Sequence, residues 1–364
     1  MICATAWLAP RWPDELPGAG WDYGVPQEYL RDLVDYWRTD YDWRTHETKL
    51  SAYPQFTTTI DGQNVHVLHV RSPEPDAVPL ILTHGWPGSI VEFVAMIGPL
   101  TDPRAHGRDP ASAFHVVVPS LPGFGLSGPT TEPGWGAERI AAAWLELMSR
   151  LGYDTFGAHG GDFGAAISRQ LGVIAPDRVI GVHLTELLSA SVSAEDADFS
   201  DPTEKRSVEA GYRYQYQLSG YMWVQSQRPQ TLAYGLADSP VGQLAWIVER
   251  FKEWSDSAAT PDDAVDRGTL LTNVMLYWLT GTAASSSRIY REGGETWGEE
   301  EPESTVPTGM AVLPGNISVP VRRLAEQKNK IVHWTELARG GHFPGLEVPD
   351  LLVDDLRTFF APLR

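Results

Sequence analysis

The sequence AHGGDFGA, residues 158–165, sets the expectation for the fold of the whole chain. A mostly apolar run at 153–158 predicts a buried strand, and the stretch at 165–171 predicts a helix. Small residues two positions before and two positions after Asp162 are what a sharp turn from strand to helix requires, because larger side chains there would clash. The segment therefore predicts a strand–turn–helix unit that exposes Asp162 at its apex.

Asp162 itself has two interpretations. In hydrolases with the pattern G-x-S-x-G, the residue at the apex of this turn is a serine that faces the active site. An aspartate in the same position would attack carbon and form an ester, so the first interpretation is covalent catalysis by a carboxylate. The second is a glycine-rich turn in which Asp162 only caps the helix, since Asp is a favoured N-cap residue.

The composition indicates a soluble globular protein. The 364 residues are enough for one large α/β domain with a smaller inserted or appended unit. The formal net charge is −19 and no run of Lys and Arg offsets it, so nucleic acid and anionic membranes are poor partners. The single cysteine, Cys3, excludes an internal disulfide framework and fits a reducing compartment.

The chain carries no recognisable targeting segment. No apolar run approaches the roughly 20 residues that a membrane span needs. The mildly apolar residues 1–10 lack the basic start and the long apolar core of a signal peptide. We therefore expect a cytoplasmic protein, without contact to a membrane, and we expect it to use neither a cofactor nor a metal.

Alternating strands and helices predict an α/β fold with a mostly parallel, doubly wound sheet. From residue 189 on, strand signals vanish and aromatic-rich helical stretches dominate until about residue 300, which predicts a helical lid. We divide the chain into an N-terminal wrapping arm (1–50), the first part of the core (51–188), the lid (189–300) and the second part of the core (301–364). Strands are expected at 55–60, 65–71, 79–83, 114–119, 153–158, 179–185, 309–313 and 331–336, and helices at 27–39, 90–97, 137–151, 165–171, 213–225, 229–236, 241–254, 269–280 and 349–360.

Polar residues follow the predicted strands at their carboxyl ends, where the reactive groups of open α/β sheets lie. A nucleophile, an acid after a later strand and a histidine after the last strand form the chain order of α/β-hydrolases. Asp162 and His342 fit this order, which favours a nucleophile and a general base over a helix cap and a solvated loop histidine. The sequence HGWP at 84–87 follows a buried strand, where an oxyanion-hole loop belongs, and the backbone N–H groups of Trp86 and Phe163 would be its donors.

Several segments resemble the microsomal-type epoxide hydrolases, and together they extend over nearly the whole chain. They are HGWPGS at 84–89, GGDFG at 160–164, SGYM at 219–222, DSPVG at 238–242, LTNVMLYWLTGT at 271–282 and RGGHF at 339–343, with WPD at 12–14 and YDWR at 41–44 in the arm. The resemblance implies an α/β-hydrolase fold with a helical lid and an N-terminal meander, without the membrane anchor of the microsomal members.

The resemblance also implies a mechanism. Asp162 would attack an epoxide carbon and open the ring to a hydroxyalkyl ester, while Tyr221 and Tyr290 of the lid would donate hydrogen bonds to the epoxide oxygen. Phenols suit this task because they stay protonated at neutral pH and can still give up a proton to a developing alkoxide. His342 would then activate water to hydrolyse the ester, and the product would be a vicinal diol.

The acid that orients His342 departs from the family pattern. In the family it lies two residues beyond a proline after the lid, and here that position is Asn316. Asparagine can orient an imidazole but cannot stabilise its positive charge, and loss of that charge in a comparable triad costs about 10⁴ in rate. Glu186, after the strand at 179–185, resembles the acid of some haloalkane dehalogenases. We predict that Glu186 is the working acid and Asn316 a neutral neighbour; the alternative is that Asn316 alone orients His342.

Two other functions stay open. A haloalkane-type dehalogenase would use the same Asp and His residues, but a leaving halide needs N–H donors, often an indole just after the nucleophile. The side chain of Phe163 has no such donor, although the indole of Trp86 could offer one. With a pair of tyrosines available as well, epoxide opening is favoured. A hydrolase-fold binding protein without turnover is the alternative that Asn316 raises. A third carboxylate near the histidine, Glu347, is expected to face the closing helix instead.

The expected partners are water and a small epoxide. A lid rich in Trp and Tyr favours an apolar or aromatic substrate. The reaction would serve detoxification or secondary metabolism, and association through the lid or the arm could give a homodimer.

Overall fold

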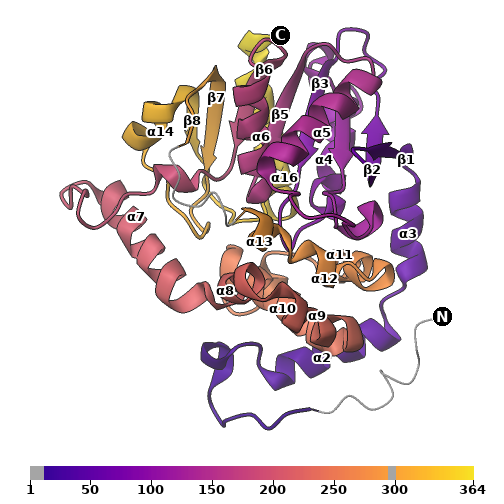
Figure 1. The fold of residues 1–364 in the computed structure, drawn as a ribbon, viewed down its shortest axis with the longest axis vertical. Helices are drawn as coiled ribbons and strands as arrows, with labels where there is room; N and C mark the ends of the chain where they lie inside the picture. Colours follow the sequence, from indigo (N-terminus) through magenta and orange to yellow (C-terminus); the bar gives the residue numbers. More distant parts are fainter. Residues whose placement is uncertain (1–11, 294–300) are drawn as a thin grey trace.

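The computed structural model describes residues 12–293 and 301–364 (Figure 1). Cys3 and the rest of residues 1–11 of the predicted arm lie outside the described residues, as do residues 294–300 at the end of the predicted lid.

An eight-stranded sheet forms the centre of the fold, with the strand order β1-β2-β4-β3-β5-β6-β7-β8 (Figure 1). Only β1 with β2 and β2 with β4 pair antiparallel, and the other neighbours are parallel. The prediction of a mostly parallel, doubly wound sheet is therefore confirmed. The strands are β1 (Gln55–Ile60), β2 (Gln63–Val70), β3 (Val78–Thr83), β4 (Phe114–Pro119), β5 (Phe156–Gly160), β6 (Val179–Leu184), β7 (Ser304–Val312) and β8 (Asn329–Glu336).

Helices cover both faces of the sheet, which explains why the central strands are nearly continuous apolar runs. On one face α5 (Ala137–Arg150) and α6 (Phe163–Ile174) bury Trp144 and Ile167 in one hydrophobic cluster. On the other face α4 (Val94–Thr101) and α16 (Pro349–Phe360) form a second cluster. Two short helices, α14 (Arg322–Lys328) and α15 (Pro344–Glu347), complete the second part of the core.

The segment between β6 and β7 is helical. Its helices are α7 (Pro202–Arg213), α8 (Gly220–Gln227), α9 (Pro229–Asp238), α10 (Pro240–Trp254), α11 (Arg267–Thr280), α12 (Ala283–Ser286) and α13 (Ile289–Gly293). Two side chains of α11 hydrogen-bond the loop that follows β3: Asn273 donates to Pro87 O at 2.8 Å, and Tyr277 donates to Gly88 O at 2.5 Å. These bonds hold the helical segment over the carboxyl end of β3. No described helix has both the length and the hydropathy that crossing a membrane requires.

Two expected helices differ from the observed ones. The helix expected at 213–225 is three elements: α7, a π-helical turn at Tyr214–Leu218, and α8. Because α7 buries little besides Glu204 and Ser207, it lacks the apolar period that marks a helix in a sequence. The helix expected at 90–97 begins as a 3₁₀ turn, and α4 then continues through Pro99.

The N-terminal arm contains two helices, α2 (Gln27–Thr39) and α3 (Trp43–Ser51), of which only the first was expected. In Figure 1, α2 lies beneath the helices of the 202–293 segment. Its Tyr29 hydroxyl donates to Asp262 at 3.2 Å, and Asp32 pairs with Arg267 at 2.8 Å. The division into arm, core and lid that we drew from the sequence stays a prediction.

The turn between β5 and α6 places Asp162 in a conformation that residues other than glycine rarely adopt, with φ 50° and ψ −132°. The backbone packs very closely here. A Cβ atom on Gly164 would lie 1.9 Å from the carbonyl oxygen of Thr83 at the end of β3. Glycine at 164 is therefore what lets the elbow dock against the neighbouring strand.

This close approach predicts that Gly164→Ala destabilises the protein. The added methyl group meets backbone that cannot move aside, so we expect a loss of about 1–3 kcal/mol in the free energy of unfolding. Urea denaturation measures it. The control is Gly211→Ala in α7, where the new Cβ meets no atom within 4 Å; it should gain about 0.5–1 kcal/mol. Equal stability of the two variants would contradict the prediction.

Candidate active site

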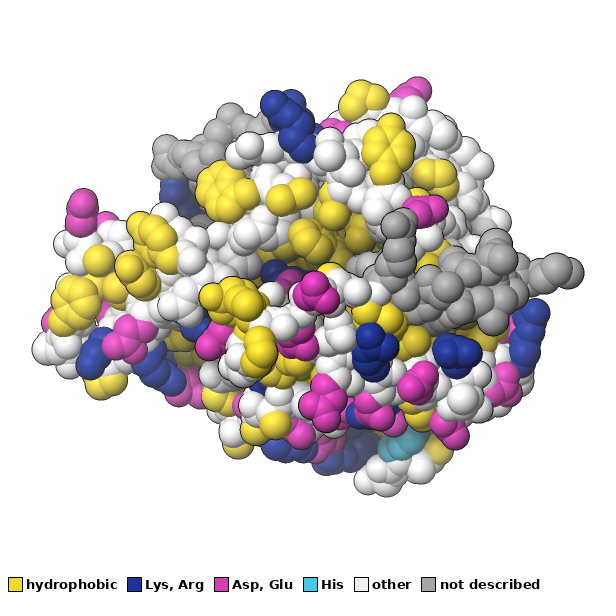
Figure 2. Space-filling view, turned by 90° about the horizontal axis from the view of Figure 1, so that it is seen from below, with side chains coloured by type: hydrophobic (Ala, Val, Ile, Leu, Met, Phe, Trp, Pro, Cys, Tyr) yellow, Lys and Arg dark blue, Asp and Glu magenta, His cyan; other side chains and the backbone are white. Residues whose placement is uncertain are grey.

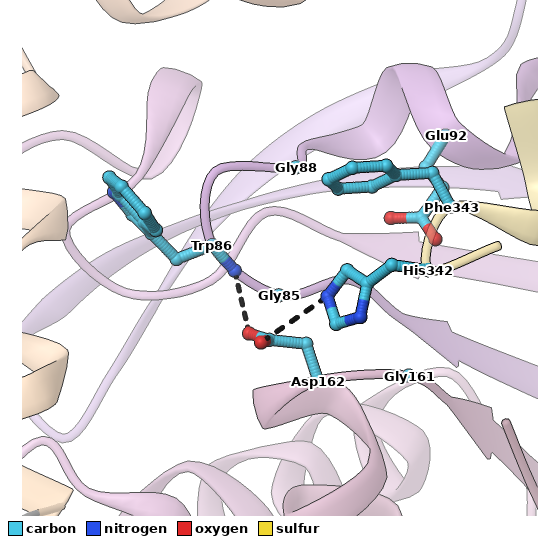
Figure 3. A pocket seen from close by; sticks show the side chains of 8 residues that line it. All are labelled: Gly85, Trp86, Gly88, Glu92, Gly161, Asp162, His342 and Phe343. Atoms are coloured by element: carbon cyan, nitrogen blue, oxygen red, sulfur yellow. Dashed lines mark hydrogen bonds and ion pairs between the residues drawn. The ribbon is translucent and has the colours of Figure 1, made fainter. Parts of the chain in front are cut away.

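Asp162, His342 and the backbone of Trp86 meet at the carboxyl ends of β3 and β5 (Figure 3). The Trp86 N–H donates a hydrogen bond of 2.9 Å to Asp162 Oδ1. The other carboxylate oxygen, Oδ2, lies 3.5 Å from His342 Nε2. The two oxygens of Asp162 therefore face two different groups, one a backbone donor and the other an imidazole.

Asn316 makes the direct hydrogen bond to His342. Its Oδ1 lies 3.1 Å from His342 Nδ1 and also accepts the N–H of Ile317 at 2.8 Å, while its Nδ2 donates to Thr185 O at 3.1 Å. These partners fix which side of the amide faces the ring, because the oxygen can only accept. His342 Nδ1 therefore carries a proton, and Nε2 is the nitrogen that faces Asp162.

Glu186 lies farther from the His342 ring than Asn316 does. Its Oε2 is 3.9 Å from His342 Nδ1, and its Oε1 accepts a hydrogen bond from Ser318 at 3.1 Å. Burial raises the pKa of Glu186, and the charge of His342 opposes that rise. The structure thus differs from the expectation that left Asn316 as a neutral neighbour: Asn316 has the hydrogen bond, and Glu186 has the charge.

The carboxyl groups around His342 raise the pKa of its imidazole. Burial by itself lowers the pKa of the imidazole, but the interaction with Asp162 and the charge of Glu186 outweigh burial and raise the pKa to about 9. At neutral pH His342 is therefore protonated and paired with Asp162.

The loop that carries His342 is braced by Glu347. Its carboxylate accepts the backbone N–H groups of Gly341 and Phe343, each at 2.9 Å, and that of Asp256 at 2.8 Å. The expectation that Glu347 faces the closing helix is wrong. Three backbone donors hold the carboxylate under the loop, so Glu347 fixes the position of His342 without touching its ring.

Tyr221 of α8 and Tyr290 of α13 lie together on the Trp86 indole. Tyr221 stacks on that ring at 5.2 Å, and Tyr290 meets it edge-on at 5.6 Å. Their hydroxyl oxygens are 3.4 Å apart, and Tyr214 adds a third hydroxyl 2.8 Å from that of Tyr221. The structure therefore brings together the two tyrosines that the family resemblance indicates.

Both tyrosines stay protonated in this environment. Burial raises the pKa of Tyr221 and of Tyr290 well above the ordinary value, and the negative charge of Asp162 adds to the rise in each case. Two neutral phenols near a carboxylate can donate hydrogen bonds to an oxygen on which negative charge develops.

Phe163 begins α6 immediately after Asp162, so its N–H belongs to the first turn and has no acceptor within the helix. Its ring contacts Tyr290 edge-on at 4.9 Å. The N–H of Phe163 thus lies directly after Asp162 in the chain, and its role as the second donor of an oxyanion hole stays a prediction.

Three residues at the site were missed in the sequence. Trp254 packs edge-on against the His342 ring at 4.9 Å, and its carbonyl oxygen accepts the His342 N–H at 2.8 Å. Tyr214 joins the tyrosine pair, and Glu92 lies buried next to His342. Of the three, only Glu92 has a sequence feature that could have indicated it: it is a charged residue in an otherwise apolar run, three positions after the HGWPGS motif.

Asp162, Glu186 and His342 each offer a ligand atom, and these atoms lie within 4.8 Å of one another, so the set could approach a metal ion. The two ring nitrogens of His342, however, face different carboxylates.

Comparison with known protein families gives two matches. Residues 4–93 match the family model described as the N terminus of epoxide hydrolases, and residues 78–238 match that of the alpha/beta hydrolase fold. A putative epoxide hydrolase of Stigmatella aurantiaca (strain DW4/3-1) is 45% identical over 98% of this chain and 81% of that protein. Epoxide hydrolase 1 of Sus scrofa is 36% identical over 94% of this chain and 82% of that protein.

Solved structures agree with these matches. The epoxide hydrolase of Aspergillus niger superposes with a TM-score of 0.87 at 31% identity, over 99% of this chain and 92% of that one. The juvenile hormone epoxide hydrolase of the silkworm Bombyx mori gives a TM-score of 0.88 at 29% identity, over 99% and 91%. The fold is that of the α/β-hydrolases, and the chain belongs to the microsomal-type epoxide hydrolase family.

Proposed function

We propose that this chain hydrolyses an epoxide to a vicinal diol through a covalent ester on Asp162. The observation that carries the proposal is the carboxylate of Asp162, held on a strained turn between the Trp86 N–H at 2.9 Å and His342 at 3.5 Å. A carboxylate aimed in this way is a nucleophile rather than a helix cap, and its side chain makes no capping hydrogen bond to α6.

In the first step, Asp162 Oδ2 attacks an epoxide carbon and the carbon–oxygen bond of the ring breaks. The ring oxygen takes a proton from Tyr221 or Tyr290 and becomes a hydroxyl group. The first step leaves one tyrosine as a phenolate near a protonated His342. Transfer of the imidazolium proton restores the phenol, so the charges balance.

In the second step, His342 acts as the base. The ester has consumed the negative charge of Asp162, which in the free enzyme contributes to the high pKa of His342. The pKa of the imidazole therefore falls once the ester forms, and neutral His342 can take a proton from water. The N–H groups of Trp86 and Phe163 are suited to hold the ester carbonyl oxygen as it becomes negative.

Asn316 and Glu186 share the role that the single acid of a catalytic triad has toward the histidine. Asn316 orients His342 through the hydrogen bond at 3.1 Å, and Glu186, 3.9 Å from the same nitrogen, stabilises the imidazolium that forms when water is deprotonated. Neither residue alone offers both the short hydrogen bond and the charge.

An apolar or aromatic epoxide is the substrate class that the surroundings favour. Figure 2, seen from the side of the lid, shows hydrophobic side chains around a recess on that face. Trp86, Tyr221, Tyr290 and Trp254 give the inner site an aromatic wall. A cytoplasmic location and a homodimer stay predictions.

Removing the nucleophile or the base separates the two steps. Asp162→Asn should form no ester with an aryl epoxide such as styrene oxide, because the amide is a poor nucleophile. His342→Gln should form the ester and hydrolyse it at least about 100-fold more slowly. Intact-mass analysis after rapid quenching measures both. A diol formed by Asp162→Asn at the wild-type rate would contradict the assignment of the nucleophile. If the wild-type protein formed neither an ester nor a diol, it would be a binding protein without turnover.

The tyrosines are expected to act on the first step alone. Tyr221→Phe and Tyr290→Phe should each slow ester formation by about 10-fold or more, because each removes a donor to the developing alkoxide. Ester decay should change less than ester formation. The matched control is Tyr216→Phe, since 65% of Tyr216 is exposed to solvent. Ester formation at the wild-type rate in both lid variants would contradict these roles.

Glu186→Gln tests the source of the charge. The Glu186 carboxylate raises the pKa of His342, so its removal should move the pH midpoint of ester hydrolysis to lower pH and slow hydrolysis about 10-fold or more at the plateau. Ester formation should stay close to the wild-type rate. Single-turnover decay of the ester across pH gives both quantities, and an unmoved midpoint would assign the support of His342 to Asn316 alone.

A further inference from the structure

A small cavity lies beside Asp162 and His342, and its volume is about 10 Å³. This is about the least volume with which a cavity can hold one water molecule, and far less than an epoxide with a substituent needs. Neither Tyr221 nor Tyr290 lines it. The cavity is thus distinct from the place where the tyrosines would meet the epoxide oxygen.

Glu92 forms one wall of this cavity (Figure 3). The residue follows the HGWPGS motif, in the 3₁₀ turn Ile90–Phe93, and only 7% of it is exposed. Among the described residues the structure gives its carboxyl group no hydrogen bond and no ion pair. A largely buried carboxyl group without a partner in the protein is costly unless a water molecule bonds it.

The charged groups that act on Glu92 are those of the site. Burial raises the pKa of Glu92 to about 8; the positive charge of His342 opposes the rise, and Asp162 and Glu347 add to it. Glu92 in turn contributes to the raised pKa of His342. The carboxyl group is therefore coupled to the nucleophile and the base.

Gly88 leaves room for the carboxyl group. A Cβ atom at this position would lie 2.9 Å from Glu92 Oε2, so any larger residue would push the carboxyl group out of its place or fill the cavity. Gly88 and Glu92 together therefore keep a small cavity open and give it a polar wall.

We propose that this cavity seats the water that hydrolyses the Asp162 ester, and that Glu92 and His342 hold that water between them. The inference rests on the proposed function. One O–H of the water would bond to His342 Nε2 and the other to an oxygen of Glu92, so that a lone pair faces the carboxyl carbon of Asp162. Glu92 can accept this bond whether or not it is protonated, because a carboxylic acid keeps a carbonyl oxygen.

The water oxygen bonds to the ester carbon while its proton moves to His342. The bond to the alkyl oxygen then breaks, and the imidazolium returns the proton to the leaving alkoxide, which gives the diol. Hydrolysis leaves Asp162 as a carboxylic acid that contains the oxygen of the water. This acid passes its proton to the neutral His342, which restores the imidazolium paired with the Asp162 carboxylate.

Replacing Glu92 separates this role from a structural one. Glu92→Leu should slow decay of the styrene oxide ester about 10-fold or more, with ester formation changed less than about threefold, because only the second step uses the water. Glu92→Gln keeps an acceptor oxygen and should recover most of the lost rate. Gly88→Ala, which crowds the carboxyl group without removing it, should also slow decay selectively. Rapid-quench intact mass gives both rates, and thermal melting checks the fold of each variant.

The outcomes are distinct. Ester decay at the wild-type rate in Glu92→Leu and Gly88→Ala would overturn the water site, as would an equal slowing of both steps. Failure of Glu92→Gln to exceed Glu92→Leu would overturn the role of the acceptor oxygen. A wild-type protein that forms diol without any ester would instead overturn the proposed function, and this inference with it.

Discussion

The contact between the β5–α6 turn and the end of β3 is the constraint on which the site depends. Asp162 occupies a left-handed backbone conformation that costs roughly 1–3 kcal/mol, and the docking of Gly164 against Thr83 O holds it there. The same contact brings the Trp86 N–H, which lies just after β3, to 2.9 Å from the carboxylate. One packing contact between two parallel strands therefore positions both the Asp162 carboxylate and the Trp86 N–H, which we propose as the nucleophile and an oxyanion donor.

Three carboxyl groups act on the single imidazole of His342. Asp162, Glu186 and Glu92 all act on His342, and together they outweigh the burial that would keep the ring neutral. Ester formation removes only the charge of Asp162. In the mechanism that we propose, the imidazole is a charged partner while Asp162 is free and becomes a base once Asp162 is esterified, so ester formation itself gives His342 the protonation state that the second step needs.

The sequence predicted the parts of this site that are local in the chain. The strand, the elbow and the loop histidine are each visible because glycines and apolar runs mark them, and the order of the strands then places Asp162 and His342 at one edge. Distances between loops are not local. Whether Asn316 or Glu186 bonds His342 depends on less than 1 Å, and the bracing by Glu347 depends on three backbone groups. Helix α7 was missed because its buried side chains are polar.

The neutral side chain of Asn316 is consistent with the carboxylate of Glu186 close by. The amide of Asn316 is fixed by Ile317 and Thr185, so it orients His342 without adding a charge. A carboxylate at position 316 would add a fourth acid around a single buried cation, next to Glu186, and like charges in a site of low dielectric raise one another's pKa values until one of them binds a proton. A neutral residue there leaves Glu186 with less competition for the charge of His342. On the roles that we propose, the neutral Asn316 is therefore the better neighbour for a carboxylate on the adjacent strand than a second carboxylate would be.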